Sequence, residues 1–505
     1  MKLSFQNEKF ILRADDGDAL AFTKDIKQAA RFRKYADSKA EKIFQTLTLT
    51  KRPLPSGGLL TPKHKKLLPF QESQGVPFIL AHSRSYLAHQ PGLGKTAQAI
   101  VAVNTRPGRA LIICPSFLKT VWAREITDWS IKDFPMIGVV PETAKQFDFD
   151  WRSYDFVICS DSMLIRAWVL KAIAGTSFRY CFIDEAHRFK TPEAARTIAL
   201  FGGKFKKVQS PGVIYDIETV CALSGTPMLN KPIELWPILK AMAPWAINNM
   251  SYHNFGFKYC GAFTDDRGHW HFTGSCNESD LHQRLKPFMQ RIRKDDVLKD
   301  LPDKVREVIV LDKDPRMQSQ IIFDERLSKK IDLSQVEKLE TLGEYAILRH
   351  INGLSKVPRA AKMVAEYLFN DKGESVLLFA HHKDVVAALY QALIFYKPRV
   401  INGLVKQSER TEIQDAFQAG TCRLIIGNID AMNLGLTLTK ATRIIFCEYA
   451  WTPALNEQAE DRAHRIGQKD SVFVQYLVLP RSLDEKILTA LLKKQSSIEK
   501  VIDGL

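Results

Sequence analysis

Short apolar runs that alternate with segments of helical periodicity constrain the fold of this chain of 505 residues more than any other feature. The first half contains four such runs, and each is followed by a polar loop or a helical pattern. This alternation is typical of parallel strands covered by helices on both faces of a sheet. The four runs are ALIIC (110–114), FVICS (156–160), YCFID (180–184) and VCALS (220–224).

A second series of apolar runs begins near residue 375. Its pattern repeats that of the first series, so we predict an α/β protein with two tandem lobes. Each lobe is expected to be a parallel sheet with helices on both faces. The five runs are SVLLFA (375–380), RVING (399–403), CRLIIG (422–427), RIIFCE (443–448) and VFVQYLVL (472–479).

The segments outside these two series give the expected domain boundaries. FILRADDGDALAF (10–22) predicts two short strands around a turn, and the basic segment 29–47 predicts a helix. We expect a small N-terminal α+β accessory domain at 1–57. The expected lobes are 58–305, with a helical insertion at about 235–295, and 306–505, with a helical insertion at about 312–352 and a C-terminal helix at about 483–502.

The charge of the chain bears on the class of partner. There are 72 Lys and Arg residues against 56 Asp and Glu residues, which gives a formal net charge of +16. Such an excess favours a polyanionic partner, because each neutralised phosphate releases counterions. Many basic proteins bind no nucleic acid, however, so the charge alone does not identify the partner.

The eight cysteines form no C-x-x-C pair, so no structural zinc is predicted. Cys114, Cys159, Cys181 and Cys447 lie in the apolar runs, where we expect small core residues in a reducing compartment. The first residues lack an apolar signal segment, and no run approaches the ~18 to 20 residues of a membrane span. We expect a soluble intracellular protein without membrane contact, cytoplasmic in a bacterium or virus and nuclear in a eukaryote.

A glycine-rich loop precedes an apolar helical pattern, and its backbone N–H groups would converge at the positive end of that helix. Lys95 would reach the β- and γ-phosphates of a nucleotide, and the Thr96 hydroxyl would ligate Mg²⁺. The strict phosphate-loop pattern has Gly where this chain has His89, which leaves open a plain glycine turn with a surface lysine. The candidate nucleotide-binding residues of this loop are Gly92, Leu93, Gly94, Lys95 and Thr96.

Two carboxylates end the apolar run YCFI, about 90 residues after that loop. Ligands of open α/β sheets bind at the carboxyl edge, where these side chains are expected. Asp184 would hold Mg²⁺ through water, and Glu185 would orient and deprotonate the attacking water. The alternative is a solvated strand end.

A third segment, QAEDRAHRIGQ, begins at Gln458 in the second α/β unit. On a helix, Arg462 and Arg465 would share a face and could act as arginine fingers on the transferring phosphoryl group. The alternative is a solvated helix on which Glu460 and Asp461 pair with these arginines. Together the three motifs predict RecA-like lobes with ATP and Mg²⁺ between them, where closing and opening can drive movement along a bound track.

In their order these motifs resemble those of superfamily-two helicase-like ATPases of the Swi/Snf group, over roughly residues 60–505. Five further segments are similar to motifs of that group: LIICPSFLKTVWAREITDW, FVICSDSML, LSGTPMLNKPIELWPIL, VLLFAHHKDVV and NLGLTLTKA. LLPFQ followed by GVPF resembles its adenine-recognition segment, which implies that Gln71 reads adenine. The resemblance also implies a nucleotide contact for Gln458 and coupling roles for Ser224, Thr226 and Gly435.

The same resemblance implies that the lobes track the backbone of duplex DNA. Ser116, Ser160 and Thr437 are small polar residues of the kind that grip phosphates without reading bases. Taken alone, each is more often a turn or cap residue than a phosphate contact. Trp451 is a candidate for stacking on a base or sugar, with a buried packing role as the alternative.

FGFKYCGAF, FTGSCNESDLHQRL and IRKDDVLKDLPDK make the chain most similar to the annealing-helicase and fork-remodeller branch of the group. Residues 1–57 resemble the small substrate-recognition domain that precedes the motor in that branch. The chain departs from the group at His89, where an acidic residue is usual, at Pro91, where Met is usual, and at Asn433, where small residues are usual. Residues 204–220 lengthen the segment before SGTP and could touch DNA or form a plain surface loop.

These features predict a DNA-dependent ATPase that uses ATP and Mg²⁺ to translocate on duplex DNA. Its expected task is to remodel branched DNA by fork regression, branch migration or strand annealing. We expect a monomer that works with DNA and with replication or recombination proteins. The alternatives are an RNA helicase of the DEAH type, a chromatin or protein–DNA remodelling ATPase, and a non-hydrolysing scaffold.

Overall fold

A computed structural model shows how these segments fold. The predicted basic helix at 29–47 and most of the predicted insertion at about 312–352 lie outside the residues that it describes. No helix in the described part of the chain is long and apolar enough to cross a membrane. The described residues are 2–6, 9–13, 19–23, 52–143, 149–205, 208–265, 268–272, 274–311, 343–370, 373–432 and 436–505.

The N-terminal segment contains a three-stranded antiparallel sheet made of β1 (Lys2–Gln6), β2 (Lys9–Arg13) and β3 (Ala19–Thr23). The two strands predicted from 10–22 correspond to β2 and β3. The first strand was not predicted. Its residues extend the sheet at the free edge of β2.

The first lobe is built on seven strands: β4 (Arg84–His89), β5 (Ala110–Cys114), β6 (Ile137–Val139), β7 (Phe156–Ser160), β8 (Tyr180–Asp184), β11 (Thr219–Leu223) and β14 (Met289–Ile292). Their order in the sheet is β14-β4-β11-β8-β5-β7-β6, and every pair is parallel. The four predicted runs are therefore confirmed as β5, β7, β8 and β11. The strands β4, β6 and β14 were not predicted.

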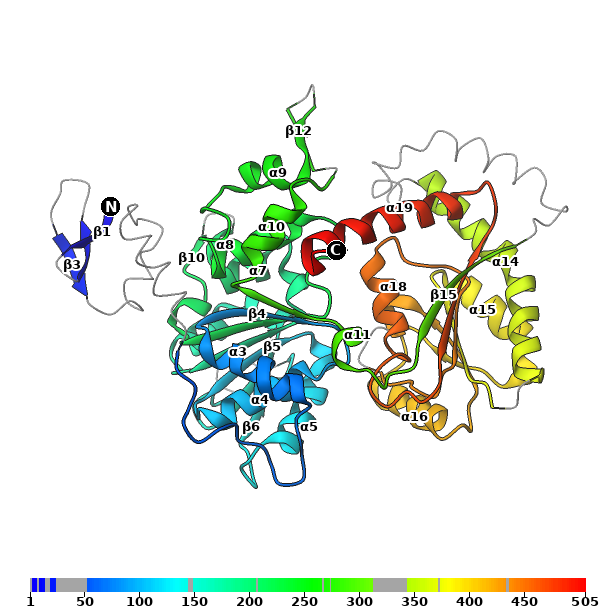
Figure 1. The fold of residues 1–505 in the computed structure, drawn as a ribbon, viewed down its shortest axis with the longest axis horizontal. Coiled ribbons are helices and arrows are strands. Elements are labelled where there is room, and N and C mark those ends of the chain that lie inside the picture. The colour runs from blue at the N-terminus through cyan, green and yellow to red at the C-terminus, as the bar shows by residue number, and fades with distance from the viewer. Residues whose placement is uncertain are drawn as a thin grey trace.

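Helices cover both faces of this sheet (Figure 1). In β5, Leu111 and Ile113 point into one core, and Ile112 and Cys114 point into the other. Because both faces are buried, the strand needs no polar alternation. One face carries α3 (Val76–Ala81), α4 (Lys95–Thr105) and α5 (Lys119–Trp129), and the other carries α6 (Ala167–Ala174), α7 (Ala195–Phe201), α8 (Trp236–Met242), α9 (Tyr252–Cys260) and α10 (Glu278–Leu285).

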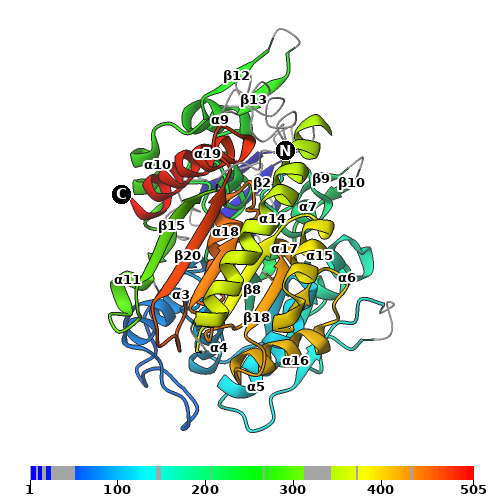
Figure 2. The same ribbon diagram turned by 90° about the vertical axis from the view of Figure 1, so that its right-hand side faces the viewer.

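The expected helical insertion at about 235–295 is only partly helical. A short hairpin of β12 (Ala262–Thr264) and β13 (Trp270–Phe272) follows α9 and projects from the first lobe in Figures 1 and 2. The prediction of a helix is wrong at the end of this segment, which forms strand β14. There Met289 pairs with Tyr86 and Ile292 pairs with His89 of β4 in a parallel register. A second hairpin, β9 (Gly203–Phe205) with β10 (Val208–Ser210), lies within the lengthened segment before SGTP.

The second lobe is built on six strands: β15 (Lys304–Val310), β16 (Val376–Ala380), β17 (Arg399–Ile401), β18 (Leu424–Asn428), β19 (Arg443–Phe446) and β20 (Val472–Val478). Their order is β15-β20-β19-β16-β18-β17, and all pairs are parallel. The five predicted runs are confirmed. Helices α14 (Gly343–Asn370) and α15 (Lys383–Ala392) cover one face, and α16 (Gln407–Gln418), α17 (Ile429–Met432), α18 (Pro453–Glu460) and α19 (Leu483–Ile498) cover the other.

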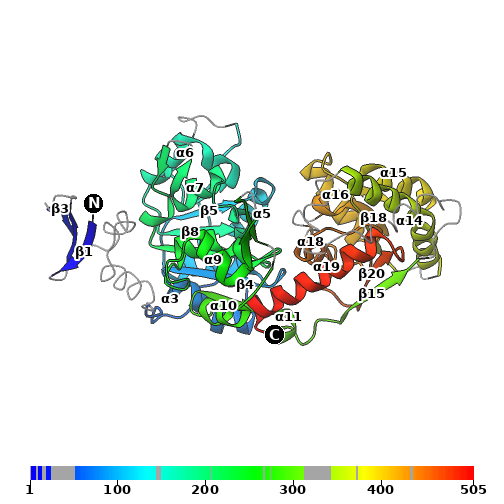
Figure 3. The ribbon, with the colours of Figure 1, turned by 90° about the horizontal axis from the view of Figure 1, so that it is seen from above.

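Helix α19 connects the two lobes, as Figures 1 and 3 show. Leu483 and Ile487 at its start belong to a core of the second lobe. The helical turn η11 (Glu499–Asp503) at its end places Val501 and Ile502 in a core of the first lobe. The C-terminal segment is thus a structural part of both lobes.

We predict that Ile502→Ala destabilises the protein although the residue lies three positions from the C-terminal end of the sequence. The side chain is 3% exposed and packs in the first-lobe core, so its truncation should cost about 2 to 5 kcal/mol. Leu492→Ala on α19 is the matched control, because Leu492 is 64% exposed and its loss should cost at most about 0.5 kcal/mol. Chemical denaturation measures both; equal midpoints for the two variants would refute this role.

Candidate active site

The predicted phosphate loop joins β4 to α4. Gly92 and Gly94 have φ angles of +86° and +67°, a region that favours glycine. The loop is tied to the edge strand β14, because the Gln90 N–H donates to the carbonyl of Ile292 over 3.0 Å. Lys95 and Thr96 begin α4, so their side chains leave from the helix end where backbone N–H groups are unpaired. The structure therefore brings the predicted residues 92–96 together at a strand-to-helix turn.

The Lys95 ammonium lies over the loop. It donates to the carbonyls of His89, over 2.8 Å, and of Gln90, over 3.4 Å. Burial lowers the pKa of Lys95 to about 8, and the Glu185 and Asp184 carboxylates oppose this shift. A half-buried ammonium that donates to neutral carbonyls can exchange them for a stronger anionic acceptor, so Lys95 is suited to bind an anionic ligand.

His89, the departure from the strict pattern, is buried at the end of β4. Its Nε2 lies 3.0 Å from the side-chain oxygen of Gln290 on β14. Burial lowers the pKa of His89 to about 3, so the imidazole is neutral at pH 7. The imidazole of His89, which stands where the strict pattern has Gly, therefore packs against the neighbouring strand β14.

Gln71 lies beside the loop, at the first position of the helical turn η2 (Gln71–Gly75). Its Oε1 accepts from the Leu68 N–H over 2.9 Å, and its Nε2 donates to the Leu93 carbonyl over 3.0 Å. A Cβ at Gly94 would lie 2.4 Å from the Gln71 Nε2, so glycine is needed there for this contact. The structure therefore places Gln71 at the predicted phosphate loop, where it braces the loop backbone.

Asp184 and Glu185 lie at the carboxyl end of β8, as predicted. The Asp184 carboxylate accepts from the Trp122 Nε1 over 2.8 Å and from the Glu185 N–H over 2.9 Å. Burial and then the Glu185 charge raise the pKa of Asp184 to about 6, so it is largely ionised at pH 7. Glu185 has φ +49° and ψ +50°, a left-handed conformation that is strained for a side chain of this kind.

The SGTP segment connects Glu185 to the second lobe. The Ser224 hydroxyl lies 3.5 Å from the Glu185 Oε2 and 2.9 Å from the His187 Nδ1. It also accepts a hydrogen bond from the Thr226 N–H over 3.1 Å. The Thr226 hydroxyl accepts from the Gln458 Nε2 over 2.8 Å. A continuous polar path therefore runs from the carboxylate at the end of β8 to α18 of the other lobe.

The two arginines do not lie on a helix, which corrects the sequence prediction. Helix α18 ends at Glu460, and the chain then forms turns in which the N–H groups of Ala463 and His464 donate to the Glu460 carbonyl over 3.1 Å each. These turns still direct both arginines to the lobe boundary. Burial and then Arg465 lower the pKa of Arg462 to about 10, and Glu185 of the first lobe opposes this shift.

Arg465 packs directly on the phosphate loop. A Cβ at Gly92 would come within 3.0 Å of the Arg465 Cβ, so this glycine lets the two lobes touch. The Arg465 guanidinium donates to the Thr437 hydroxyl over 3.1 Å. The Glu460 and Asp461 carboxylates, the partners in the alternative interpretation, are bound by cations of β15 and of the segment after β14.

The candidate DNA contacts have mixed environments. Ser116 is exposed at the start of a short turn, whereas Ser160 is buried and its hydroxyl lies 2.8 Å from the Ser162 hydroxyl. Trp451 is only 5% exposed and lies under the Arg349 guanidinium, 5.3 Å from its ring centroid, so its contacts are those of the packing alternative. Gly435 and Asn433 lie outside the described residues.

Sequence reasoning missed Arg291, Trp122 and His187. The Arg291 guanidinium donates to the carbonyls of Ala88 and Gly225, over 2.9 Å each, and fastens the loop strand to the SGTP segment. Trp122 orients Asp184, and His187 contacts Ser224. Trp122 belongs to a quoted motif segment and Arg291 directly precedes another, but only the fold reveals which neighbours they touch.

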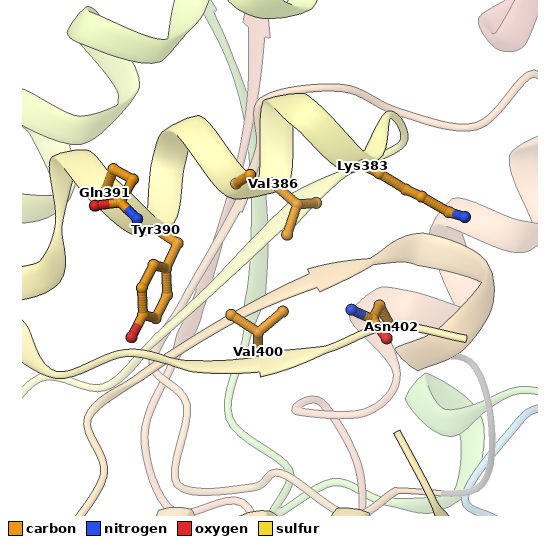
Figure 4. Close-up of a pocket in the computed structure, with 7 residues that line it drawn as sticks. Lys383, Val386, Tyr390, Gln391, Val400 and Asn402 are labelled. Atoms are coloured by element: carbon orange, nitrogen blue, oxygen red, sulfur yellow. The ribbon is translucent and has the colours of Figure 1, made fainter. Parts of the chain in front are cut away.

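A separate pocket of about 260 Å³ lies on the second lobe, between α15 and β17 (Figure 4). Lys383 and Asn402 lie at one end of it and Tyr390 at the other. None of the predicted site residues lines it, so it is distinct from the nucleotide site. Its lining is Lys383, Val386, Ala387, Tyr390, Gln391, Val400 and Asn402.

Comparison with known proteins identifies the family. The model of the SNF2-related domain matches residues 71–362, more than half of the chain, and the model of the helicase conserved C-terminal domain matches residues 359–467. The chain belongs to the SNF2-related family. The family match covers the predicted motifs of the first lobe from Gln71 onward, and the second match covers those of the second lobe up to Gly467.

Two SNF2-family relatives show the extent of the similarity. The chain is 31% identical over 460 residues to the "DNA annealing helicase and endonuclease ZRANB3" of Mus musculus, which covers 87% of this chain and 41% of that protein. It is 31% identical over 435 residues to the "SWI/SNF-related matrix-associated actin-dependent regulator of chromatin subfamily A-like protein 1 homolog" of Caenorhabditis elegans, over 83% of this chain and 60% of that protein. The chain therefore spans only part of the length of these relatives.

A solved structure of an SNF2 protein also matches. It is described as the "Sulfolobus solfataricus SWI2/SNF2 ATPase core in complex with dsDNA", with 22% sequence identity and a TM-score of 0.41. The match covers 87% of this chain and 93% of that chain.

The ionisable groups of this SNF2-family site predict a pH dependence. If Asp184 holds Mg²⁺ and Lys95 holds phosphate, as the sequence predicts, Mg²⁺ binding needs the Asp184 carboxylate ionised and phosphate binding needs Lys95 protonated. With pKa values of about 6 and about 8, affinity for a non-hydrolysable Mg-nucleotide should rise with pH through about 6 and fall above about 8. In Glu185→Gln the acidic midpoint should move to lower pH, because the charge that raises the pKa of Asp184 is gone. An affinity that stays constant from pH 5 to 9 would contradict this assignment.

Proposed function

We propose that this chain is a DNA-dependent ATPase that moves on duplex DNA and remodels branched DNA by fork regression, branch migration or strand annealing. The observation that carries the proposal is the polar path from Glu185 through Ser224 and Thr226 to Gln458, which crosses the lobe boundary beside the phosphate loop. Such a path makes the hydrolytic carboxylate sensitive to lobe closure. The names of the ZRANB3 relatives, which describe annealing helicases, support the choice of substrate.

The first lobe would bind the nucleotide. Lys95 and the N–H groups of the loop would hold the phosphates, Gln71 would contact adenine, and Asp184 with the Thr96 hydroxyl would hold Mg²⁺. This oxygen donor set suits Mg²⁺, which takes one or two protein ligands together with substrate phosphates and water. When bound, Mg²⁺ would neutralise charge on the phosphates. Glu185, at the end of β8, would accept a proton from the attacking water.

The second lobe would complete the site. Arg465 already contacts Gly92 of the phosphate loop, and Arg462 lies in the electrostatic range of Glu185. Both guanidiniums would stabilise the negative charge that develops on the transferring phosphoryl group. Hydrolysis would then require closed lobes, and product release would permit opening.

We propose domain boundaries at 1–57, 58–305 and 306–505, with the N-terminal unit as a DNA-substrate recognition domain. Ser116, Ser160 and Thr437 would contact phosphates of the track. Ser224, Thr226 and Gly435 would couple these contacts to hydrolysis. Replication or recombination proteins would be the cellular partners, and the working unit would be a monomer.

The function is tested by measuring ATP turnover with single-stranded, duplex, forked and four-way DNA and with RNA. We expect duplex and branched DNA to stimulate turnover and branched DNA to be converted to annealed or regressed products. Stronger stimulation by RNA would favour an RNA helicase, and activity limited to protein–DNA complexes would favour a chromatin remodeller. Turnover unchanged by any polynucleotide would exclude a motor.

Glu185→Gln should lower DNA-stimulated turnover by about 100-fold or more, because the general base is lost, while ATP is still bound. Glu193→Gln is the matched control, since Glu193 is an exposed glutamate eight positions away and should leave turnover unchanged. Turnover and equilibrium nucleotide binding are measured on the same preparations. A scaffold function would be indicated if wild type and Glu185→Gln were equally inactive.

A further inference from the structure

We propose that Lys294 is a positioning residue that sets the arginine segment of the second lobe against the phosphate loop of the first. This role rests on the proposed ATPase function. It concerns a residue outside the nucleotide motifs, in the chain segment that leaves the last strand of the first sheet.

The backbone of Lys294 is fixed to the phosphate loop. Lys294 begins the short helix α11 (Lys294–Val297), one residue after the end of β14. Its N–H donates to the Gln90 side-chain oxygen over 2.7 Å, and the Gln90 N–H donates to the Ile292 carbonyl over 3.0 Å. These two hydrogen bonds fix the start of α11 relative to the first residues of the phosphate loop.

The Lys294 side chain crosses to the other lobe. Its Nζ donates to the Asp461 carboxylate over 2.7 Å and to the carbonyl of His464. Asp461 immediately precedes Arg462, and His464 immediately precedes Arg465. One ammonium group therefore holds the residues next to both arginines.

Lys294 and Arg465 also meet at one point of the loop. A Cβ built on Gly92 would lie 3.0 Å from the Arg465 Cβ and 3.8 Å from the Lys294 Cε. The bare backbone of Gly92 is thus covered from the second lobe by the arginine and from the first lobe by the lysine stem. Displacement of the lysine would remove the support on one side of this contact.

The charges around the arginine segment come from both lobes. Within the second lobe, Lys304 and Arg306 of β15 hold Glu460 over 2.9 Å and 2.6 Å, and Lys304 lies 3.4 Å from the Asp461 carboxylate. Lys294 adds a cation of the first lobe to this cluster. Although burial opposes its ionisation, Asp461 has a pKa held well below its usual range by Lys294 and Lys304.

The burial of the Lys294–Asp461 pair indicates that it fixes the relative position of the two lobes more than it stabilises the fold. The Lys294 and Asp461 side chains are 4% and 3% exposed. Dehydration offsets much of the attraction within a buried ion pair, so its net contribution to folding is small, whereas its geometry is demanding. An ion pair of this kind can form only when the two lobes have one relative position, which is the position that brings the arginines to the loop.

The test compares turnover with nucleotide binding. Lys294→Met should lower kcat of DNA-stimulated ATP hydrolysis by about 10- to 100-fold, because a small misplacement of the arginines is costly. Binding of ATP, measured by titration of the variant in a Glu185→Gln background, should stay within about twofold, since the phosphate loop remains intact. Lys294→Arg should restore most of kcat, because a guanidinium can still pair with Asp461.

Two further variants keep the proposal falsifiable. Asp461→Asn should lower kcat in the same way, and its effect should not add to that of Lys294→Met, because both remove one interaction. Lys299→Met is the matched control, since Lys299 is an exposed lysine of the same segment. An unchanged kcat in Lys294→Met, additive effects, or an equal loss in Lys299→Met would overturn the proposal. An inactive wild-type protein would instead refute the proposed function.

Discussion

One helix with its two ends in two hydrophobic cores constrains every relation between the lobes. Leu483 at the start of α19 is buried in the second lobe, and Val501 after its end is buried in the first. Arg291 of β14 pairs with Asp503 at 2.7 Å and ties this end to the strand beside the phosphate loop. The lobes are therefore joined twice, through the segment between β14 and β15 and through α19. Their relative motion is limited to what a rigid helix between two cores allows, and the arginine segment can approach the loop from few directions.

Within this frame the predicted phosphate loop holds a half-buried cation that has no direct anionic partner among the hydrogen bonds of the described residues. Lys95 is half-buried and bonded to the neutral carbonyls of His89 and Gln90, while Asp184 and Glu185 influence it from the end of β8. A phosphate carries full negative charge and attracts the ammonium more strongly than a neutral carbonyl does, so a phosphate would displace both carbonyls from Lys95. The ammonium is thus held close to the place where a phosphate is needed, at little cost of rearrangement. Binding energy can then be directed to lobe closure.

The sequence predicts those parts of the fold for which a short local pattern is enough to identify the element. Strands such as β5 and β8 are continuous apolar runs because both faces of a parallel sheet are buried, and the glycine loop is recognisable because its chemistry is local. Strand β14 was missed because Met289-Gln-Arg-Ile292 continues a helical pattern, and only pairing with β4 makes it a strand. The helix proposed for the arginines failed because Glu460 and Asp461 are held by distant cations, which stop α18. Lys294 carries no local signal, since its partner Asp461 lies 167 positions away.

The edge of the first sheet also joins the candidate DNA contacts to the candidate catalytic segment after β8. Asp161, next to Ser160 at the end of β7, is buried and accepts from Arg188 over 2.7 Å, with Arg196 at 3.4 Å. Arg188 follows His187 in the turn after β8, and β5 lies between these two strands in the sheet. A buried carboxylate that loses its cation is costly, so the two turns must move together. If Ser160 contacts a phosphate of the track, as proposed, its displacement would reach His187 and Ser224 through this ion pair. Track binding and ATP hydrolysis would then be coupled within the first lobe, before the second lobe closes.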